Sequence, residues 1–438
     1  MKVFLVSLGC SKNLVDSEIM LGILKQAGFS ITQKPEAAQV AIVNTCAFIN
    51  DAKQEAIEAI FELVKLKKQG GLKTIIVAGC LPQRYKHKLS FLLKEADGFL
   101  GPGNIHKIVK VIASSCKGKR PLLIDRSHYL YKDSTPRKLL TPSHYAYVKI
   151  ADGCNNRCGY CVIPRIRGNY HSRTIESVVK EVKGLARTGV KEINLISQDT
   201  TFYGQDRYGK PKLDVLLKKL VQIKELKWIR ILYAHPHHLK RSLLDIIAGE
   251  SKICSYIDLP IQHINDKILK LMRRKVTSYE IRKLIDDIRS LMPEAALRTT
   301  LIVGYPQETE KDFKQLCDFV RAVGFERLGV FKYSRQENTP AAKLTGHLPD
   351  KIKEKRFKKV MLLQQKIIAK KNSSLIGRQM DVLIDRRQAD NVALGRSQFD
   401  APEVDGLVYV KGKNIKEGDF IKVKITDSLL YDLCGVKL

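Results

Sequence analysis

Residues 154–161 read Cys-Asn-Asn-Arg-Cys-Gly-Tyr-Cys, and they follow a β-rich run at 145–150. Three thiolates on one short loop can wrap around a cluster of soft metal ions, as they do in iron–sulfur proteins. Structural zinc normally has four protein ligands, and no fourth Cys or Cys–His pair stands nearby. His171 offers a fourth ligand, so a zinc site remains the alternative interpretation of this loop.

A cubane [4Fe–4S] cluster normally takes four protein thiolates, so three leave one iron open. A small molecule can chelate an open iron, much as a vacant coordination position makes a metal site catalytic. The loop therefore predicts a catalytic iron–sulfur cluster with Cys154, Cys158 and Cys161 as its ligands.

Strand and helix patterns alternate on the carboxyl side of this loop. The candidate strands are 145–150, 192–197, 229–234, 256–261, 296–304 and 328–333. Polar clusters follow four of them, namely Gln198-Asp199-Thr200, His235-Pro236-His237, Gln262-His263 and Tyr305-Pro306. A parallel barrel builds its active site from the loops at that rim. We therefore predict a partial (β/α)6 TIM-like barrel, in which His235, His237, His238 and His263 either move protons, position substrate or simply pack.

The amino-terminal part repeats one arrangement three times. β-rich runs at 3–9, 40–45 and 74–79 each end directly before a cysteine, and helical patterns at 16–27 and 51–67 separate them. Right-handed crossovers between parallel strands place all the carboxyl ends on one edge of a sheet. We expect a doubly wound parallel α/β domain in which Cys10, Cys46 and Cys80 converge, although three buried structural cysteines are the alternative.

The composition sets the broad class of the protein. At roughly 150 residues per domain, 438 residues predict about three domains. A net charge of +32 attracts polyanions and favours RNA or an RNA-containing partner, unless the whole proteome is basic. No stretch has the roughly 18 apolar residues of a membrane span, and no secretory leader is recognisable. We therefore expect a cytoplasmic globular protein whose 10 cysteines serve metal or redox chemistry rather than disulfides.

The carboxyl-terminal part differs from the rest in its charge. A basic helical pattern at 350–371 favours a solvated connecting helix, with RNA contact as the alternative. Beyond Leu375 a short β-rich module carries equal numbers of acidic and basic residues, which argues against phosphate binding. Its acidic stretch of Asp400, Glu403 and Asp405 is a candidate docking surface for a basic protein partner. The expected boundaries are 1–126, a linker at 127–143, 144–372 and 373–438.

Cys154-x3-Cys158-x2-Cys161 on a partial barrel resembles the radical S-adenosylmethionine superfamily. With Cys10, Cys46 and Cys80 added, essentially the whole chain resembles its methylthiotransferase branch, in which the last module is a TRAM domain. Four segments are similar to the RimO-type members of that branch: Ser7-Leu8-Gly9-Cys10-Ser11-Lys12-Asn13, Ile150-Ala151-Asp152-Gly153-Cys154-Asn155-Asn156-Arg157-Cys158, Pro260-Ile261-Gln262-His263-Ile264 and Asp400-Ala401-Pro402-Glu403-Val404-Asp405-Gly406.

The resemblance implies methylthiolation of an aspartate β-carbon in the twelfth small-subunit ribosomal protein. It implies two [4Fe–4S] clusters, one at each cysteine trio, and S-adenosylmethionine as the source of both the 5′-deoxyadenosyl radical and the methyl group. The implied partners are the ribosomal protein, ribosomal RNA through the basic surface, and an electron donor. A tRNA methylthiotransferase of the MiaB type and a non-catalytic iron–sulfur ribosome-binding factor are the alternatives.

The resemblance also suggests contacts with S-adenosylmethionine. Tyr160 would flank the adenine, and Gly304, Tyr305 and Pro306 would contact it from the fifth strand end. Ser197, Gln198 and Asp199 would bind the amino group from the second strand end. Relatives commonly have glycine where this chain has Gln307 and Asn338, which leaves the shapes of those two loops open.

Overall fold

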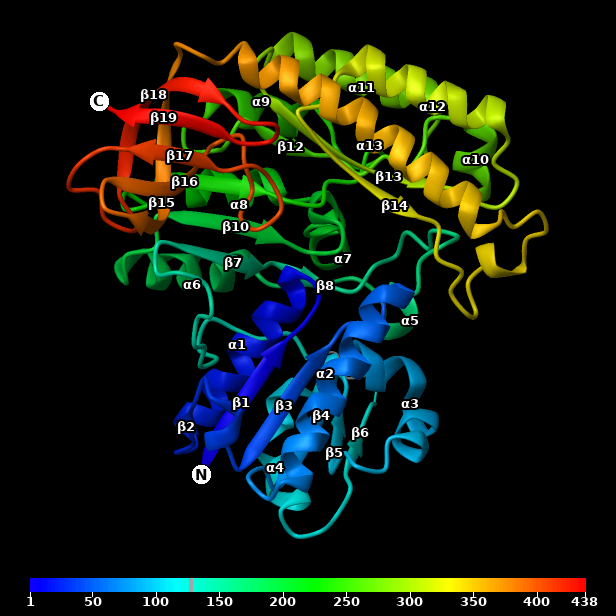
Figure 1. Cartoon of the computed structure of the whole chain (residues 1–438), viewed down its shortest axis with the longest axis vertical. Coiled ribbons are helices and arrows are strands. Elements are labelled where there is room, and N and C mark those ends of the chain that lie inside the picture. Colours follow the sequence, from blue (N-terminus) through cyan, green and yellow to red (C-terminus); the bar gives the residue numbers. More distant parts are fainter. Residues whose placement is uncertain (126–128) are drawn as a thin grey trace.

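The computed structural model describes residues 1–125 and 129–438, which form three units (Figure 1). An amino-terminal α/β unit lies below the central partial barrel, and a small β barrel lies beside the tails of the central strands. This arrangement confirms the expected fold class. Residues 127 and 128 of the expected linker lie outside the described residues, and 129–143 contain no helix or strand. Among the residues described, no helix is long and apolar enough to cross a membrane.

The amino-terminal unit is a parallel sheet with the strand order β2-β1-β3-β4-β5-β6. Its strands are β1 (Lys2–Ser7), β2 (Ser30–Ile31), β3 (Val40–Thr45), β4 (Thr74–Gly79), β5 (Gly98–Leu100) and β6 (Leu122–Leu123). Its helices are α1 (Ser11–Gln26), α2 (Asn50–Lys68), α3 (Cys80–Leu92), α4 (Ile108–Ser115), η1 (Pro35–Ala37) and η2 (Pro102–Lys107). Helix α1 begins five residues before the expected start, because its first turn is polar and carries no apolar periodicity.

Both faces of this sheet are covered, as a doubly wound fold requires. Along β3, Val40 and Ile42 pack with α1 and α4 on one face, and Ala41 and Val43 pack with α2 and α3 on the other. Successive side chains of a strand point to opposite faces, so an uninterrupted apolar run is what a strand between two helical layers needs.

The central unit has six parallel strands in sequence order. They are β7 (Tyr145–Lys149), β10 (Glu192–Ile196), β11 (Trp228–Ile231), β12 (Tyr256–Asp258), β13 (Ala296–Val303) and β14 (Arg327–Lys332). They form two three-stranded sheets, and a bridge between Ile229 and Ile253 connects the sheets. Residues Ala146 and Val148 pack outward under the helices, whereas Tyr145, Tyr147 and Lys149 belong to the inner side. The result is the expected open barrel of six βα units.

Helices cover the outside of the barrel strands. They are α6 (Ile175–Arg187), α8 (Leu213–Leu220), α9 (Arg241–Gly249), α10 (Asp266–Leu271), α11 (Ser278–Leu291), α12 (Glu310–Val323) and α13 (Asp350–Ser373). Shorter elements are β8 (Ala151–Asp152), α5 (Ile163–Ile166), β9 (His171–Ser172), η3 (Thr200–Phe202), α7 (Gln205–Tyr208) and η4 (Ala341–Lys343). Capping boxes at Thr277 and Thr309 start α11 and α12. The basic pattern at 350–371 is indeed a helix, and it leads into the last unit.

The last unit is a closed five-stranded barrel with the order β15-β16-β17-β19-β18. Its strands are β15 (Gln379–Ala389), β16 (Val392–Ser397), β17 (Val408–Lys411), β18 (Phe420–Ser428) and β19 (Leu433–Lys437). It packs against the amino ends of the central strands, where Arg396 pairs with Glu192 at 2.8 Å. It therefore lies at the opposite end of the barrel from the rim that carries the polar clusters.

Two of the three acids in the expected docking surface, Asp400 and Asp405, are buried in contacts within the chain, whereas Glu403 is exposed. Asp400 is 2% exposed and pairs with Arg327 at the start of β14. Asp405 accepts a hydrogen bond from the Tyr256 hydroxyl and faces Arg298. Glu403 accepts from the Tyr145 hydroxyl at 3.1 Å. Asp400 and Asp405 thus neutralise arginines of the central barrel, and all three contacts hold two units of the same chain together.

The two positions at which relatives commonly have glycine keep a left-handed backbone here. Gln307 has φ 66° and Asn338 has φ 64°. Asn tolerates this region better than most residues, whereas a long side chain such as that of Gln costs about 1 kcal/mol. Both positions thus have the left-handed backbone that glycine adopts readily, although neither residue is glycine.

We predict that Arg327→Met lowers the free energy of unfolding by about 3 kcal/mol, because it leaves the buried Asp400 carboxylate without its cation. Calorimetric unfolding of the full chain measures the change. Arg378→Met is the matched control, because Arg378 and its partner Glu294 are both more than half exposed. It should cost less than about 1 kcal/mol. Equal shifts for the two variants would contradict the structural role given to Asp400.

Candidate active site at the meeting of two cysteine trios

The first trio lies where the sequence places it. Cys10, Cys46 and Cys80 follow β1, β3 and β4, which are neighbours in the sheet. The strand order reverses between β1 and β3, and such a switch point is where open α/β sheets bind ligands. Cys10 and Cys46 both act on the pKa of Cys80, Cys10 acts on the pKa of Cys46, and a Cβ on Gly9 would lie 3.2 Å from the sulfur of Cys46. The expected convergence of the three cysteines is therefore present.

Glycines before two of the cysteines allow this close approach. Gly9 has φ +87°, and a Cβ there would lie 2.6 Å from the Cβ of Cys46. Gly79 has φ +93°, and a Cβ there would lie 2.4 Å from Oδ1 of Asn44. Any side chain at either position would collide with the neighbouring loop, so glycine is required to bring the thiols together.

The three thiols differ in their electrostatic surroundings. Burial raises the pKa of Cys80 to about 12 and also raises the pKa of Cys46. Burial opposes ionisation of Cys10 as well, but Lys12 and Arg167 outweigh it, and the pKa of Cys10 is lowered. Cys10 is thus the member of the trio that ionises most readily.

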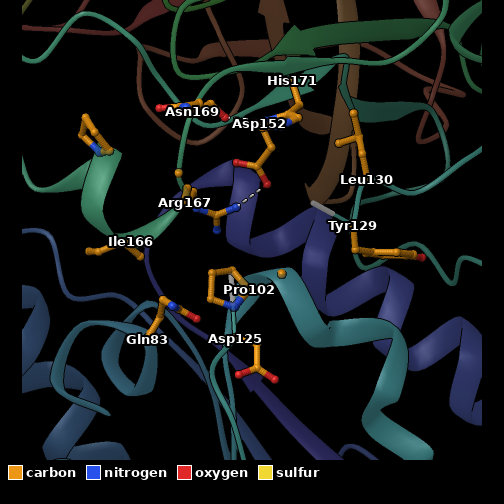
Figure 2. A pocket seen from close by; sticks show the side chains of 13 residues that line it. Gln83, Pro102, Asp125, Tyr129, Leu130, Asp152, Ile166, Arg167, Asn169 and His171 are labelled. Atoms are coloured by element: carbon orange, nitrogen blue, oxygen red, sulfur yellow. Dashed lines mark hydrogen bonds and ion pairs between the residues drawn. The ribbon is translucent and has the colours of Figure 1, made fainter. Parts of the chain in front are cut away.

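Arg167 connects this trio to the central barrel. Its guanidinium donates to Asp16 of α1 at 2.9 Å and to Asp152 of β8 at 2.8 Å, and it lies 3.9 Å from the sulfur of Cys80. Figure 2 shows Arg167 reaching Asp152 across the cavity between the two units. Lys149 pairs with the same two carboxylates at 2.5 and 2.9 Å. Two buried cations thus balance two buried anions at the domain junction.

The second trio lies on the loop that follows Asp152. Burial raises the pKa of Cys154 to about 11 and also raises the pKa of Cys161, and the neighbouring thiols act in the same direction. The Arg274 guanidinium lies 3.7 Å from the sulfur of Cys158, and the backbone N–H of Ile163 donates to the sulfur of Cys161 at 3.5 Å. Donors of this kind stabilise thiolates and tune the potentials of iron–sulfur clusters.

The sulfur atoms of neither trio are all as close together as the ligands of a single metal ion. The ligands of one zinc ion lie roughly 4 Å apart. In the described part of the chain, one group of three or more His, Cys, Asp or Glu residues has all its ligand atoms within 4.8 Å, and it contains neither trio. His171, the fourth ligand of the zinc alternative, lines the cavity of Figure 2 with Arg167 and Asp152. In each trio at least two of the sulfur atoms therefore lie more than 4.8 Å apart, which argues against one zinc ion held by all three.

The residues expected to contact S-adenosylmethionine from the second strand end lie at the rim beside the second trio. Gln198 donates to Oδ1 of Asp152 at 2.9 Å. Asp199 accepts from Asn156, which belongs to the cysteine loop, at 2.7 Å. Ser197 is buried and accepts a hydrogen bond from the backbone N–H of Asp199 at 3.1 Å. Asp199 and Gln198 are thus tied to the cysteine loop by hydrogen bonds.

The residues expected to surround the adenine lie on the other side of the same loop. Tyr305 is fully buried, and its hydroxyl donates to the carbonyl of Leu271. A Cβ on Gly159 would lie 3.0 Å from that hydroxyl, so the cysteine loop packs directly on Tyr305. Tyr160 packs in the same cluster, and Gly304 and Pro306 flank Tyr305 in a buried turn.

The rim histidines form a hydrogen-bonded group rather than free bases. Nδ1 of His238 lies 2.7 Å from Oδ2 of Asp199, and His235 accepts from the backbone N–H of His237. Burial lowers the pKa of His235 well below its usual range and lowers the pKa of His263 to about 3. Asp199, His235 and His238 are the group whose ligand atoms lie within 4.8 Å, but Asn156 and Thr201 already donate to Asp199.

Four residues of the site were not singled out from the sequence. They are Arg167, Arg274, Lys12 and Tyr233. Three are ordinary basic residues in a chain with 77 Lys and Arg, so composition gives them no distinction. The proximity of Lys12 to Cys10 was the one available signal.

Comparison with known families covers most of the chain. Residues 2–101 match a family described as "Uncharacterized protein family UPF0004", residues 148–320 match the radical SAM superfamily, and residues 376–437 match the TRAM domain. The three matched segments coincide with the three units of the fold.

Curated relatives match along almost the whole chain. A protein of Clostridioides difficile named "Ribosomal protein uS12 methylthiotransferase RimO" is 48% identical over 99% of this chain and 98% of its own length. Proteins of the same name from Heliobacterium modesticaldum and Caldicellulosiruptor saccharolyticus are 46% and 48% identical, with 99% of this chain covered in each case.

Solved structures support the fold. The radical S-adenosylmethionine methyltransferase TsrM of Kitasatospora setae matches with a TM-score of 0.58 at 15% identity, over 78% of this chain and 76% of its own. The cobalamin-dependent radical enzyme OxsB matches with a TM-score of 0.51 at 12% identity, over 84% of this chain and 56% of its own. At these identities the likenesses bear on the fold alone.

The different pKa shifts predict an order of alkylation in protein freed of iron by chelation. Because a lowered pKa gives more thiolate near neutral pH, iodoacetamide should modify Cys10 at a lower pH than Cys46, and Cys80 last. Peptide mass spectrometry across a pH series measures the midpoints. The same protein unfolded in guanidinium is the control, since its three cysteines should share one profile. A Cys10 midpoint at or above that shared value would contradict the electrostatics described here.

Proposed function

The chain belongs to the RimO family of ribosomal protein uS12 methylthiotransferases, and we propose that it adds a methylthio group to the β-carbon of an aspartate in that ribosomal protein. It is a radical S-adenosylmethionine methylthiotransferase. The observation that carries the proposal is the pairing of two three-thiol sites across one domain junction, connected through Arg167 and Asp152.

The proposed cofactors are two [4Fe–4S] clusters, one on Cys10, Cys46 and Cys80 and the other on Cys154, Cys158 and Cys161. The donors on Cys158 and Cys161 support this assignment, and so does the failure of either trio to meet the close spacing of a single-ion site. Held by Cys154, Cys158 and Cys161, the barrel cluster would supply an electron for radical chemistry on S-adenosylmethionine, and a cluster held by Cys10, Cys46 and Cys80 would supply the sulfur to be transferred.

The residues of the chain position these groups and contribute little acid–base chemistry. Removing a proton from an unactivated C–H bond is beyond a side-chain base. His235 and His263 are held neutral by burial, which suits a site that needs no strong proton donor there. Arg274 screens the charge of the Cys158 thiolate, and Arg167 fixes the distance between the two domains.

The proposed contacts with S-adenosylmethionine come from both sides of the cysteine loop. Tyr160, Gly304, Tyr305 and Pro306 surround the adenine, and Ser197, Gln198 and Asp199 bind the amino group. The hydrogen bonds from Gln198 to Asp152 and from Asn156 to Asp199 support this, because they hold the rim against the cluster loop. Side chains held by hydrogen bonds in this way lose less freedom when a ligand binds.

The remaining parts of the proposal concern organisation and surroundings. The proposed divisions are 1–126, a linker at 127–143, 144–372 and 373–438. The protein acts in the cytoplasm on a small-subunit ribosomal protein, and its net charge of +32 supports contact with ribosomal RNA. The same charge is the observation that favours a tRNA methylthiotransferase instead. Mass spectrometry of uS12 and of tRNA from a deletion strain separates the two, since loss of methylthio groups from tRNA alone would reject our choice.

We predict that a substitution in one cysteine trio removes the function of that trio and leaves the function of the other intact. Anaerobically reconstituted protein should hold about eight irons per chain, and Cys158→Ala or Cys46→Ala should each hold about four. With a reductant and S-adenosylmethionine, Cys158→Ala should release no 5′-deoxyadenosine, because the open iron that binds the nucleotide is lost. Cys46→Ala should still release it but should transfer no sulfur. Iron analysis, chromatography of the nucleoside and mass spectrometry of uS12 measure the three results.

Cys254→Ala is the control for this experiment, because Cys254 is buried in the apolar core and belongs to neither trio. It should retain iron, cleavage and sulfur transfer. About four irons in the unmodified chain would reject the second cluster, and cleavage that survives Cys158→Ala would reject the assignment of the barrel trio.

A further inference from the structure

Lys12 is a buried cation at the junction of the amino-terminal and central units. It lies in the first turn of α1, two residues after Cys10, and is 7% exposed. No carboxylate of the described residues lies within ion-pair distance of its ammonium group, whereas Lys149 and Arg167 nearby are each paired with Asp16 and Asp152. Burying a charge is costly unless a group of opposite charge accompanies it. The neighbouring pairs balance each other, so the charge of Lys12 is left over.

The ring of Tyr233 holds Lys12 in place. The ammonium nitrogen lies 3.2 Å from the ring centroid, a close cation–π contact, and the Tyr233 hydroxyl lies 3.3 Å from the Ser11 hydroxyl. An aromatic face attracts a cation but leaves its remaining N–H donors unused, because a ring offers no lone pair. Tyr233 therefore positions Lys12 without neutralising it.

Tyr233 itself is in a strained conformation that the barrel imposes. Its φ is 63°, a region that bulky side chains rarely adopt. The carboxylate of Asp258 accepts its backbone N–H at 2.8 Å, and its carbonyl accepts the backbone N–H of Thr200 at 3.0 Å. Thr200 follows Asp199 at the rim of the barrel, so these hydrogen bonds hold the backbone of Tyr233 at that rim. The ring of Tyr233 points from there toward α1. Strain of this kind persists where the orientation of a side chain matters.

From these contacts we propose that Lys12 binds the carboxylate of the aspartate to be modified and thereby selects an acidic side chain. This inference rests on the proposed function. A methylthiolated β-carbon lies next to its carboxylate, so a cation between the sulfur-carrying trio and the rim holds that carbon near both. Two other negative groups could be the partner of Lys12, namely the carboxylate of S-adenosylmethionine and the first cluster. The test separates the three.

The test is a double-mutant cycle on affinity. Reconstituted enzyme, unchanged or as Lys12→Met, is titrated with purified uS12 and with small ribosomal subunits, each carrying either the target aspartate or asparagine. Methionine keeps the length of lysine and packs well on an aromatic ring, so it removes little except the charge. The unchanged enzyme should lose at least about tenfold in affinity on Asp→Asn, whereas Lys12→Met should bind the two forms equally within about twofold.

Lys359→Met is the matched control, because Lys359 also lies over an aromatic ring, that of Phe313, but on the exposed face of α13. It should keep the full preference for aspartate. If Lys12→Met keeps that preference too, the proposal is wrong. If Lys12→Met keeps the preference for aspartate but binds S-adenosylmethionine more weakly, Lys12 binds the nucleotide instead. If it keeps the preference but its iron content falls to half, Lys12 stabilises the cluster instead. An unchanged enzyme that binds neither uS12 nor the subunits contradicts the proposed function instead.

Discussion

The buried ion-pair network of Arg167, Lys149, Asp16 and Asp152 is the constraint on which the site depends. Side chains of these residues are at most 17% exposed, so each charge needs a partner within the network. Asp16 comes from the amino-terminal unit, and the other three come from the central unit. The charges of the two units are balanced only in the arrangement that places Cys80 beside Arg167. Arg167 also pairs with Asp152, and Cys154 follows Asp152 by two residues in the sequence. Electrostatic balance thus sets how the two cysteine trios face one another.

Most of the fold could be predicted from the sequence, because the positions of the cysteines indicate where the parallel strands end. Cys10, Cys46 and Cys80 each follow a strand, and the parallel βα arrangement then requires them to converge. The loop at 154–161 shows its chemistry through spacing alone. The resemblance to a known family added roles for single residues, such as Ser197 and Tyr305, that spacing does not supply.

What could not be predicted depends on burial and on partners distant in sequence. Arg167, Arg274 and Lys12 look like any other basic residue until the fold removes them from water. The acidic stretch at 400–405 was predicted to be a docking surface because the sequence shows the charge of its residues but not their burial. The polar first turn of α1 was missed for a related reason: apolar periodicity marks helices that pack, and this turn serves the site instead.

The burial of that acidic stretch also explains why the last unit carries no net charge. The amino ends of the central strands bring Arg230, Arg298 and Arg327 to the opening of the barrel that faces the small β barrel, and an open barrel must cover such groups or leave them hydrated. Asp400 and Asp405 cover two of them from the β barrel, while Arg396 of that barrel pairs with Glu192 of the central unit. The acids of the last unit are thus used within the chain. The rim at the other end, with Lys12 beside it, is left as the place where an acidic substrate side chain meets an unbalanced positive charge.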